Sequence, residues 1–313
     1  MKKVLFATTA MVATAGMAYA ESHAGVKLSG SGRFGIVYND SAALTSSTKV
    51  EKRMTINIDG SGSTDGGLDF GGRIRLRSDE NRSTAESAAN VYMGNDTFRL
   101  TVGNTNGALL QRVGYYQGSV GLTGLHWANV SFNIGTATFY LNSFSSRGGS
   151  AADIVRLDFN VGGFGVSLST DSTGDHASGT SEDAIAVSYN FGDWTVAAGH
   201  AKDARGVGAD ATSLSVVGSI GDFGVGLGYT NLDTVGDKVT LSGSYSFGDT
   251  TVTAFVGRES VDVAGTFGFA AGDDSETVYG IGFTHSLGGA TLAGGVSEKL
   301  DNTMADLGVR FSF

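Results

Sequence analysis

The sequence VKLSGSGRFGIVY, residues 26–38, alternates between two kinds of residue. Apolar side chains or glycine hold the even positions from Val26 to Tyr38, and residues such as Lys27 and Arg33 stand between them. Because successive side chains of a β-strand point to opposite faces, this period of two predicts a strand with one apolar and one polar face.

The same alternation returns along the whole chain, in sixteen segments. They lie near residues 26–38, 49–59, 67–78, 87–93, 97–103, 153–160, 164–170, 183–191, 194–200, 212–220, 223–230, 238–247, 250–258, 277–287, 290–297 and 303–313. Many reach the roughly 9–11 residues with which a tilted strand crosses the hydrocarbon layer, whereas strands of soluble proteins average about 5–6 residues. We therefore predict an all-β fold, a 16-stranded antiparallel transmembrane β-barrel.

The connections between these segments alternate in length. Tight turns with glycine occur at residues 192–193, 221–222, 248–249 and 288–289. Long polar connections occur at residues 39–48, 79–86, 171–182, 201–211, 231–237, 259–276 and 298–302. Short turns at one end and long loops at the other are typical of an outer-membrane barrel, and aromatic residues beside the short turns, such as Phe191 and Phe247, suit the membrane interface.

A sheet in a bilayer is expected to close on itself, because no water is there to satisfy a free strand edge. In the last segment, Leu307 and Phe311 belong to the apolar face and Asp306 to the polar face, and we expect this segment to pair with residues 26–38. Sixteen strands enclose a lumen too wide for side chains to fill, so water is expected to occupy it.

Composition excludes several other classes of protein. Among 313 residues there are 49 glycines, no proline, no cysteine and a net charge of −10. The absence of cysteine rules out disulfides, iron–sulfur clusters and Cys-ligated zinc, and the acidic balance argues against nucleic-acid binding. Residues 30–35 fit the pattern G-x-G-x-x-G, but neither a preceding strand nor a following helix supports a dinucleotide site. His176 near Asp171 and Asp175 suggests a hydrolytic triad only by adjacency.

Residues 1–20 have the order of a secretory signal peptide. A basic start at Lys2 and Lys3 precedes an apolar run over residues 4–16, and the small-residue site Ala18-Tyr19-Ala20 follows. The apolar run is shorter than the ~20 residues that a membrane-spanning helix needs. We expect cleavage after Ala20, which leaves residues 21–313 as the mature barrel domain.

Three stretches of the mature chain carry a family resemblance: VKLSG at 26–30, VYMG with FRLTVG over 91–103, and MADLGVRFSF at 304–313 with its terminal phenylalanine. In this order they resemble the trimeric general porins of alphaproteobacteria, of the Rhodobacter type. The resemblance implies a homotrimer in the outer membrane of a Gram-negative bacterium, surrounded by lipid and lipopolysaccharide. It also implies passive diffusion of ions and small hydrophilic solutes, no enzymatic activity, and a third loop folded into each barrel.

Residues 104–152 form the longest connection without clean alternation, so we assign them to this constriction loop. The loop contains Arg112 and Arg147 but no aspartate or glutamate. Its other notable residues are Gln111, Tyr115, Tyr116, Gln117, His126 and Trp127. Constriction loops of the resembled family are commonly acidic, so the cation preference that such loops suggest does not carry over to this chain.

Arginines on the polar phase of the early segments are the candidates for the pore wall opposite the loop. They are Arg33, Arg53, Arg73, Arg75, Arg77 and Arg99, with Arg112 from the loop itself and Arg156 and Arg310 as further candidates. A charge on the lipid face at mid-bilayer costs ~2–4 kcal/mol, whereas a charge facing the lumen stays hydrated. Glu51, Asp59 and Asp69 are the acids that would offset them, the latter two towards the short turns. We predict a weakly anion-preferring or near-neutral pore.

Most other acids gather in the long loops, for example Asp273 and Asp274. They are interpreted as a solvated surface, with loop-bound Ca²⁺ or Mg²⁺ as the alternative, although no EF-hand spacing supports a dedicated site. No cofactor is expected. The alternative function is an outer-membrane barrel enzyme or a closed structural or adhesin barrel, neither of which would conduct ions across a planar bilayer.

Overall fold

The computed structural model describes residues 24–41, 47–80, 82–114, 118–125, 128–139, 141–147, 153–171, 181–204 and 208–313. The expected signal peptide and several loop residues singled out above lie outside these ranges: residues 1–20, Tyr115, Tyr116, Gln117, His126, Trp127 and His176. In the part of the chain that is described, no helix is long and apolar enough to cross a membrane.

The described residues form strands and one short helix, α1, at Ala108–Val113. The strands are β1 (Ala24–Asn39), β2 (Thr48–Ser63), β3 (Asp69–Asp79), β4 (Ala85–Glu86), β5 (Asn90–Gly94), β6 (Phe98–Gly103), β7 (Asn133–Ile134), β8 (Ala137–Thr138), β9 (Ile154–Val161), β10 (Phe164–Asp171), β11 (Asp183–Phe191), β12 (Trp194–Ala204), β13 (Ala209–Ile220), β14 (Phe223–Leu232), β15 (Gly236–Phe247), β16 (Thr250–Val261), β17 (Ser275–Ser286), β18 (Ala290–Lys299) and β19 (Asn302–Ser312).

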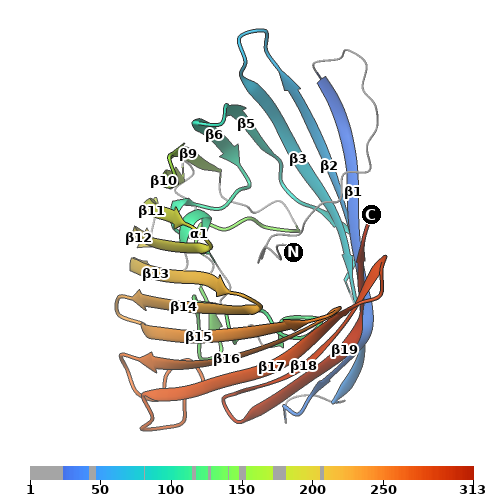
Figure 1. Ribbon diagram of the computed structural model, residues 1–313. Helices are drawn as coiled ribbons and strands as arrows, with labels where there is room; N and C mark the ends of the chain where they lie inside the picture. The colour runs from blue at the N-terminus through green and yellow to red at the C-terminus, as the bar shows by residue number, and fades with distance from the viewer. Residues whose placement is uncertain are drawn as a thin grey trace.

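All strands except the small β7–β8 hairpin belong to one antiparallel sheet that closes on itself. β1 pairs with β2 on one side and with β19 on the other, with Ser31 opposite Ser312. β4 and β5 both pair with β3 and together make one stave, so the 17-stranded sheet is a barrel of sixteen staves. Figure 1 shows this ring of strands, with the red β19 beside the blue β1. The predicted 16-stranded antiparallel barrel is confirmed.

The two faces of the barrel are the reverse of those of a soluble protein. Along β15, Lys238 and Thr240 are buried, whereas Val239 and Leu241, which alternate with them, are among the exposed large hydrophobic residues. In β19, Asp306 is 6 % exposed and its neighbour Leu307 is 45 % exposed. A bilayer solvates apolar side chains and leaves charged ones to the interior, which accounts for this arrangement.

The short turns lie where the glycine pattern placed them. Gly192 and Gly248 open two-residue turns with φ of 58° and 55°, in the left-handed region that glycine enters without a steric penalty. Aromatic rings stack beside these turns: Phe164 lies 4.2 Å from Tyr189, and Phe223 lies 4.5 Å from Tyr245, measured between ring centroids. Tyrosine, an apolar ring with a polar hydroxyl, suits the boundary between lipid and water.

Two of the predicted long connections prove to be short. β14 and β15 are joined by residues 233–235, and β18 and β19 by Leu300 and Asp301 alone. The hydrogen-bonded pairing of these strands extends beyond the residues that alternate between apolar and polar. A strand end outside the hydrocarbon layer no longer needs an apolar outer face. The boundaries of the fourth predicted segment also differ, since the carbonyls of Ala88 and Ala89 accept hydrogen bonds from Asn104 instead of extending the ladder.

The described residues between β6 and β9 pack against the inner face of the barrel; we call the described part of residues 104–147 the inner segment. Its helix α1 lies against β10–β13, as Figure 1 shows for β11 and β12. Leu109 and Leu110 of α1 share a buried apolar cluster with wall alanines such as Ala186 and Ala197. Alanine on the inner face of these strands leaves room for the helix, so apolar packing fills this side of the barrel.

Candidate functional site

Five of the arginines predicted for the pore wall lie on the three neighbouring strands β1, β2 and β3. Arg33 of β1 pairs across the ladder with Arg53 of β2, and Arg53 pairs in turn with Asp79 of β3. Arg73 stands opposite Asp59, Arg75 opposite Asn57, and Arg77 opposite Thr55. We call the six residues of the predicted set the arginine wall: Arg33, Arg53, Arg73, Arg75, Arg77 and Arg99.

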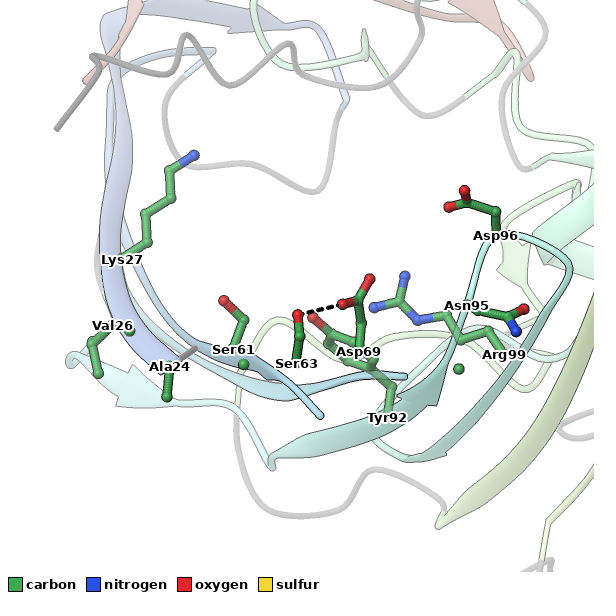
Figure 2. Close-up of a pocket in the computed structure, with 13 residues that line it drawn as sticks. Ala24, Val26, Lys27, Ser61, Ser63, Asp69, Tyr92, Asn95, Asp96 and Arg99 are labelled. Atoms are coloured by element: carbon green, nitrogen blue, oxygen red, sulfur yellow. Dashed lines mark hydrogen bonds between the residues drawn. The ribbon is translucent and has the colours of Figure 1, made fainter. Parts of the chain in front are cut away.

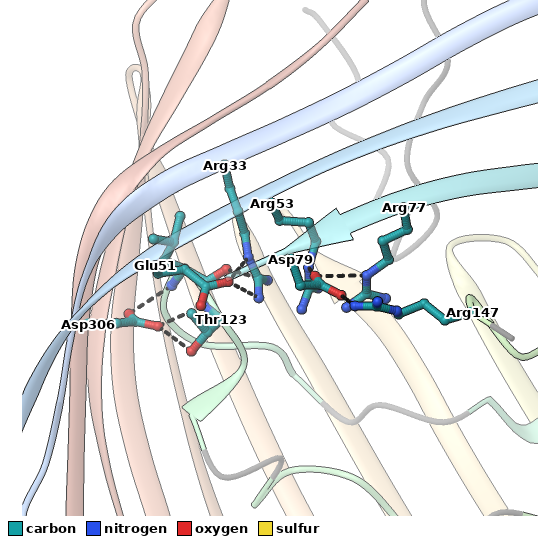
Figure 3. Close-up of polar contacts among 9 residues, drawn as sticks. Arg33, Glu51, Arg53, Arg77, Asp79, Thr123, Arg147 and Asp306 are labelled. Carbon is teal, nitrogen blue, oxygen red and sulfur yellow. Dashed lines mark hydrogen bonds and ion pairs between the residues drawn. The ribbon is translucent and has the colours of Figure 1, made fainter. Parts of the chain in front are cut away.

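Asp79 is the centre of the largest ion-pair cluster. It forms ion pairs with Arg53, with Arg77 at 2.9 Å and with Arg147 of the inner segment at 2.8 Å. Figure 3 shows the three guanidinium groups converging on this carboxylate. The charge-assisted contact of Arg147 with Asp79 holds the inner segment against the wall at this point.

Two further acids each neutralise one arginine of the wall. Glu51 binds Arg33, with 2.6 Å between Oε1 and Nη2, and Asp59 binds Arg73, with 2.5 Å between Oδ1 and Nε. The sequence predicts Glu51 and Asp59 as offsetting acids but places Asp79 in the connection 79–86, whereas the structure places it at the end of β3. It continues the odd-numbered alternation of Arg73, Arg75 and Arg77, which is the signal that would have found it.

Arg99 stands apart from this cluster, at the short-turn end of the barrel. Its guanidinium lies 3.5 Å from the centroid of the Tyr92 ring. A cavity of about 760 Å³ opens here, lined by Lys27, Asp69 and Asp96 among others. These charged side chains all rise from the wall into the same open space (Figure 2).

Arg112 does not face the arginine wall. Its Nε donates to Ser167 Oγ at 2.7 Å, its Nη1 to Asn160 Oδ1 at 2.8 Å, and its Nη2 to the carbonyl oxygens of Phe159 and Val166. Burial lowers the pKa of this guanidinium, and the nearby Asp158 carboxylate acts in the opposite direction. Arg112 thus anchors α1 to β9 and β10 and presents little charge to the rest of the lumen.

A second anchor holds the middle of the inner segment to β19 and β1. Asp306 accepts hydrogen bonds from the backbone N–H groups of Leu122 at 2.8 Å and Thr123 at 2.7 Å, and from the Thr123 hydroxyl at 2.7 Å. Arg33 donates to the carbonyl of Leu122 at 3.2 Å. Figure 3 places Asp306, Thr123 and Arg33 together beside the β1–β19 closure.

The third anchor is a buried cluster of three ionisable side chains. Lys238 of β15 and Lys299 of β18 both bind Glu259 Oε1 of β16, at 2.8 and 2.9 Å. Lys238 also donates to the carbonyls of Ala128 and Asn133, while Glu259 Oε2 accepts the backbone N–H of Gly135. Glu259 opens the predicted long connection 259–276, whose acids are expected on the solvated surface; instead it is fully buried on the inward phase of β16.

Charged side chains line the interior of the barrel, and ion pairs and hydrogen bonds fix most of them in place. Among the described residues, no three histidine, aspartate or glutamate side chains gather closely enough to hold a metal ion. A closed sixteen-stave barrel, apolar outside and charged inside, with a segment folded against its inner wall, defines a transmembrane channel of the porin class.

Comparisons with known proteins give the same class. The model of the Gram-negative porin family matches residues 7–304. The porin of Fuscovulum blasticum is 31% identical over 304 residues, covering 92% of this chain and all of that protein; the porin of Rhodobacter capsulatus is 28% identical over 327 residues with the same coverage. A solved triple mutant of Rhodopseudomonas blastica porin superposes with a TM-score of 0.75 at 28% identity, over 92% of this chain and 100% of that one.

The chain belongs to the Gram-negative porins. It is therefore a channel protein of the porin type and not an enzyme, as the resemblance predicted.

Proposed function

We propose that the protein is a passive diffusion channel for ions and small hydrophilic solutes, weakly anion-preferring or near neutral. The observation that supports this most is the imbalance of charge beside the inner segment. The six arginines Arg33, Arg53, Arg73, Arg75, Arg77 and Arg147 face the three carboxylates Glu51, Asp59 and Asp79. A net positive charge in a narrow aqueous passage attracts anions.

The inner segment, within the predicted loop 104–152, is the proposed constriction. Its apolar residues pack with β11–β16, whereas Ser146 and Arg147 reach back to Arg75 and Asp79 of β3. The path for solutes then runs along the arginine wall. This proposal makes the selectivity depend on β1–β3 and on the returning end of the inner segment.

Reversal potentials in a KCl gradient test the proposed channel. Stepwise ohmic conductance with a permeability ratio near one, or slightly in favour of chloride, is expected. A strongly cation-selective pore would contradict the proposed selectivity. Absence of conductance in well-inserted protein would favour the closed structural or adhesin barrel instead.

We further propose a homotrimer in the outer membrane of a Gram-negative bacterium, exported by the segment 1–20 and surrounded by lipid and lipopolysaccharide. The exposed apolar outer face supports this, because such a surface is unstable in water. The mature chain from Glu21 should run as a trimer in mild detergent, and a water-soluble monomer would contradict the proposal. Loop-bound Ca²⁺ or Mg²⁺ is the alternative to a merely solvated acidic surface, and a fall in the trimer's melting temperature on chelation by EDTA would favour it.

A further inference from the structure

Arg75 differs from the other arginines of β3 in its partners. Arg73 and Arg77, two residues away on either side, are paired with Asp59 and Asp79. Among the described residues, no carboxylate lies within ion-pair distance of Arg75. The central guanidinium of the row therefore carries a charge that the protein does not neutralise directly.

Neutral groups hold this guanidinium in a fixed orientation. Its Nε donates to Asn57 Oδ1 at 2.9 Å, its Nη1 donates to Ser146 Oγ at 3.1 Å, and its Cζ lies 4.7 Å from the centroid of the Phe144 ring. Two of its five N–H groups are thus engaged. Nη2 has no hydrogen-bond partner in the described part of the chain, and the residue is half-buried on the inward face.

The surroundings favour an anion at this position. Residues two apart on a strand are separated by about 7 Å. On the Arg77 side three arginines share the single carboxylate of Asp79 and add a net positive field to that of Arg75, whereas Arg73 is neutralised by Asp59. A planar guanidinium with parallel N–H groups matches two oxygens of one carboxylate or phosphate, whereas a monatomic chloride cannot use both in the same way. Asn57, Ser146 and Phe144 supply the orientation before any solute arrives, which lowers the entropic cost of binding.

We propose that Arg75 is an oxyanion-binding subsite within the channel, taking a carboxylate or phosphate group of a passing solute. The inference deepens the proposed diffusion function and rests on it, since a solute reaches Arg75 only through an open lumen. Transport of oxyanions then saturates with concentration, while chloride and potassium currents stay proportional to concentration.

Single-channel recording with inorganic phosphate, and separately with acetate, tests the subsite. With KCl as the background electrolyte, increasing phosphate or acetate should reduce the chloride current to a plateau with a millimolar midpoint. Saturation by phosphate alone assigns a phosphate site, and saturation by acetate alone assigns a carboxylate site; both support the proposal. A chloride current unaffected by either anion would overturn it and leave the diffusion channel standing, whereas no channel in KCl would overturn the proposed function first.

Two variants separate binding from charge. Arg75→Lys keeps the charge but loses the planar pair of donors, so the reversal potential should stay close to wild type while the oxyanion midpoint rises roughly tenfold, equivalent to about 1.4 kcal/mol. The matched control is Asp59→Asn with Arg73→Gln, which removes a neighbouring neutral pair and should leave the midpoint within about twofold.

If Arg75 only supports the inner segment and binds no anion, the expected result is different. Arg75→Lys would then alter KCl conductance and oxyanion block together, and the control pair would resemble wild type in both. An unchanged oxyanion midpoint in Arg75→Lys, with normal KCl conductance, would also overturn the subsite.

Discussion

At the scale of single residues, the interior is organised by a few carboxylates that each serve several cations. Asp79 binds Arg53, Arg77 and Arg147, and Glu259 binds Lys238 and Lys299. The Asp79 side chain is 11% exposed, whereas that of Glu259 is fully buried. The first is therefore expected to govern ions in the pore, and the second the stability of the inner segment.

Replacing Asp79 should shift the ion selectivity of the pore towards anions. Asp79→Asn leaves three arginines without their shared counter-charge, and a unit charge acts on an ion 4 Å away with about 1 kcal/mol even in water. We expect the chloride-to-potassium permeability ratio, measured from reversal potentials, to rise several-fold. Asp69→Asn is the control, because Asp69 bonds Ser63 at the short-turn end rather than an arginine. Equal shifts for both variants would contradict the role given to Asp79.

Replacing Glu259 should destabilise the protein. Glu259→Gln leaves two buried ammonium groups without a carboxylate, and breaking a buried pair in this way costs ~3–5 kcal/mol. The free energy of unfolding in denaturant should fall by this order. Glu80→Gln, which breaks the exposed 3.9 Å pair with Lys52, should cost less than about 1 kcal/mol. A loss for Glu259→Gln no larger than that of the surface control would show that the buried cluster is not needed.

The sequence predicted which face of the barrel these residues occupy better than it predicted which residues they pair with. Alternation placed Arg53 and Arg73 on the inward face, because phase is a local property of one strand. Which acid meets which arginine depends on the register between strands and on the path of the inner segment. Arg147 reaches Asp79 across 68 residues of sequence, and Lys299 reaches Glu259 across 40. No local pattern contains that information.

At the scale of elements, the alternation predicted strands well where they cross lipid and poorly where they leave it. β15 and β16 were predicted to within about three residues, whereas the two-residue turn at Leu300 and Asp301 was taken for part of a long loop. Contact with lipid requires an apolar outer face, and this requirement is visible in the sequence as the alternation of apolar and polar residues. Outside the lipid, a strand needs only its ladder, which any residue type except proline can supply.

The closing strand β19 gives a direct test of its faces. Leu307 is exposed on the apolar face, whereas Ser312 is on the opposite phase near the chain end. Leu307→Arg places a charge towards lipid at a cost of ~2–4 kcal/mol, and should cripple insertion measured by heat-stable assembly in outer membranes. Ser312→Arg should be mild. Similar losses for the two variants would mean that the faces of β19 are reversed.

At the scale of the whole molecule, two populations of charge act on an ion over different distances. The chain has a net charge of −10, although the arginine wall carries an excess of cations. The balancing acids must therefore lie elsewhere, and exposed residues such as Asp273 and Asp274 beyond β16 are among them. Ions inside the passage meet the wall at contact distance, whereas they sense the outer acids only through the intervening electrolyte.

Selectivity should consequently depend on salt. The Debye length is about 3 Å in 1 M salt and about 10 Å in 0.1 M, so high salt screens the outer acids more completely than the wall. The wild-type pore should prefer chloride slightly in 1 M KCl and drift towards neutrality in 0.1 M KCl. Arg73→Ser with Arg75→Ser removes two wall cations and should become cation-preferring, most clearly at low salt. Reversal potentials at both concentrations measure this, and a double variant indistinguishable from wild type would show that the arginine wall does not control permeation.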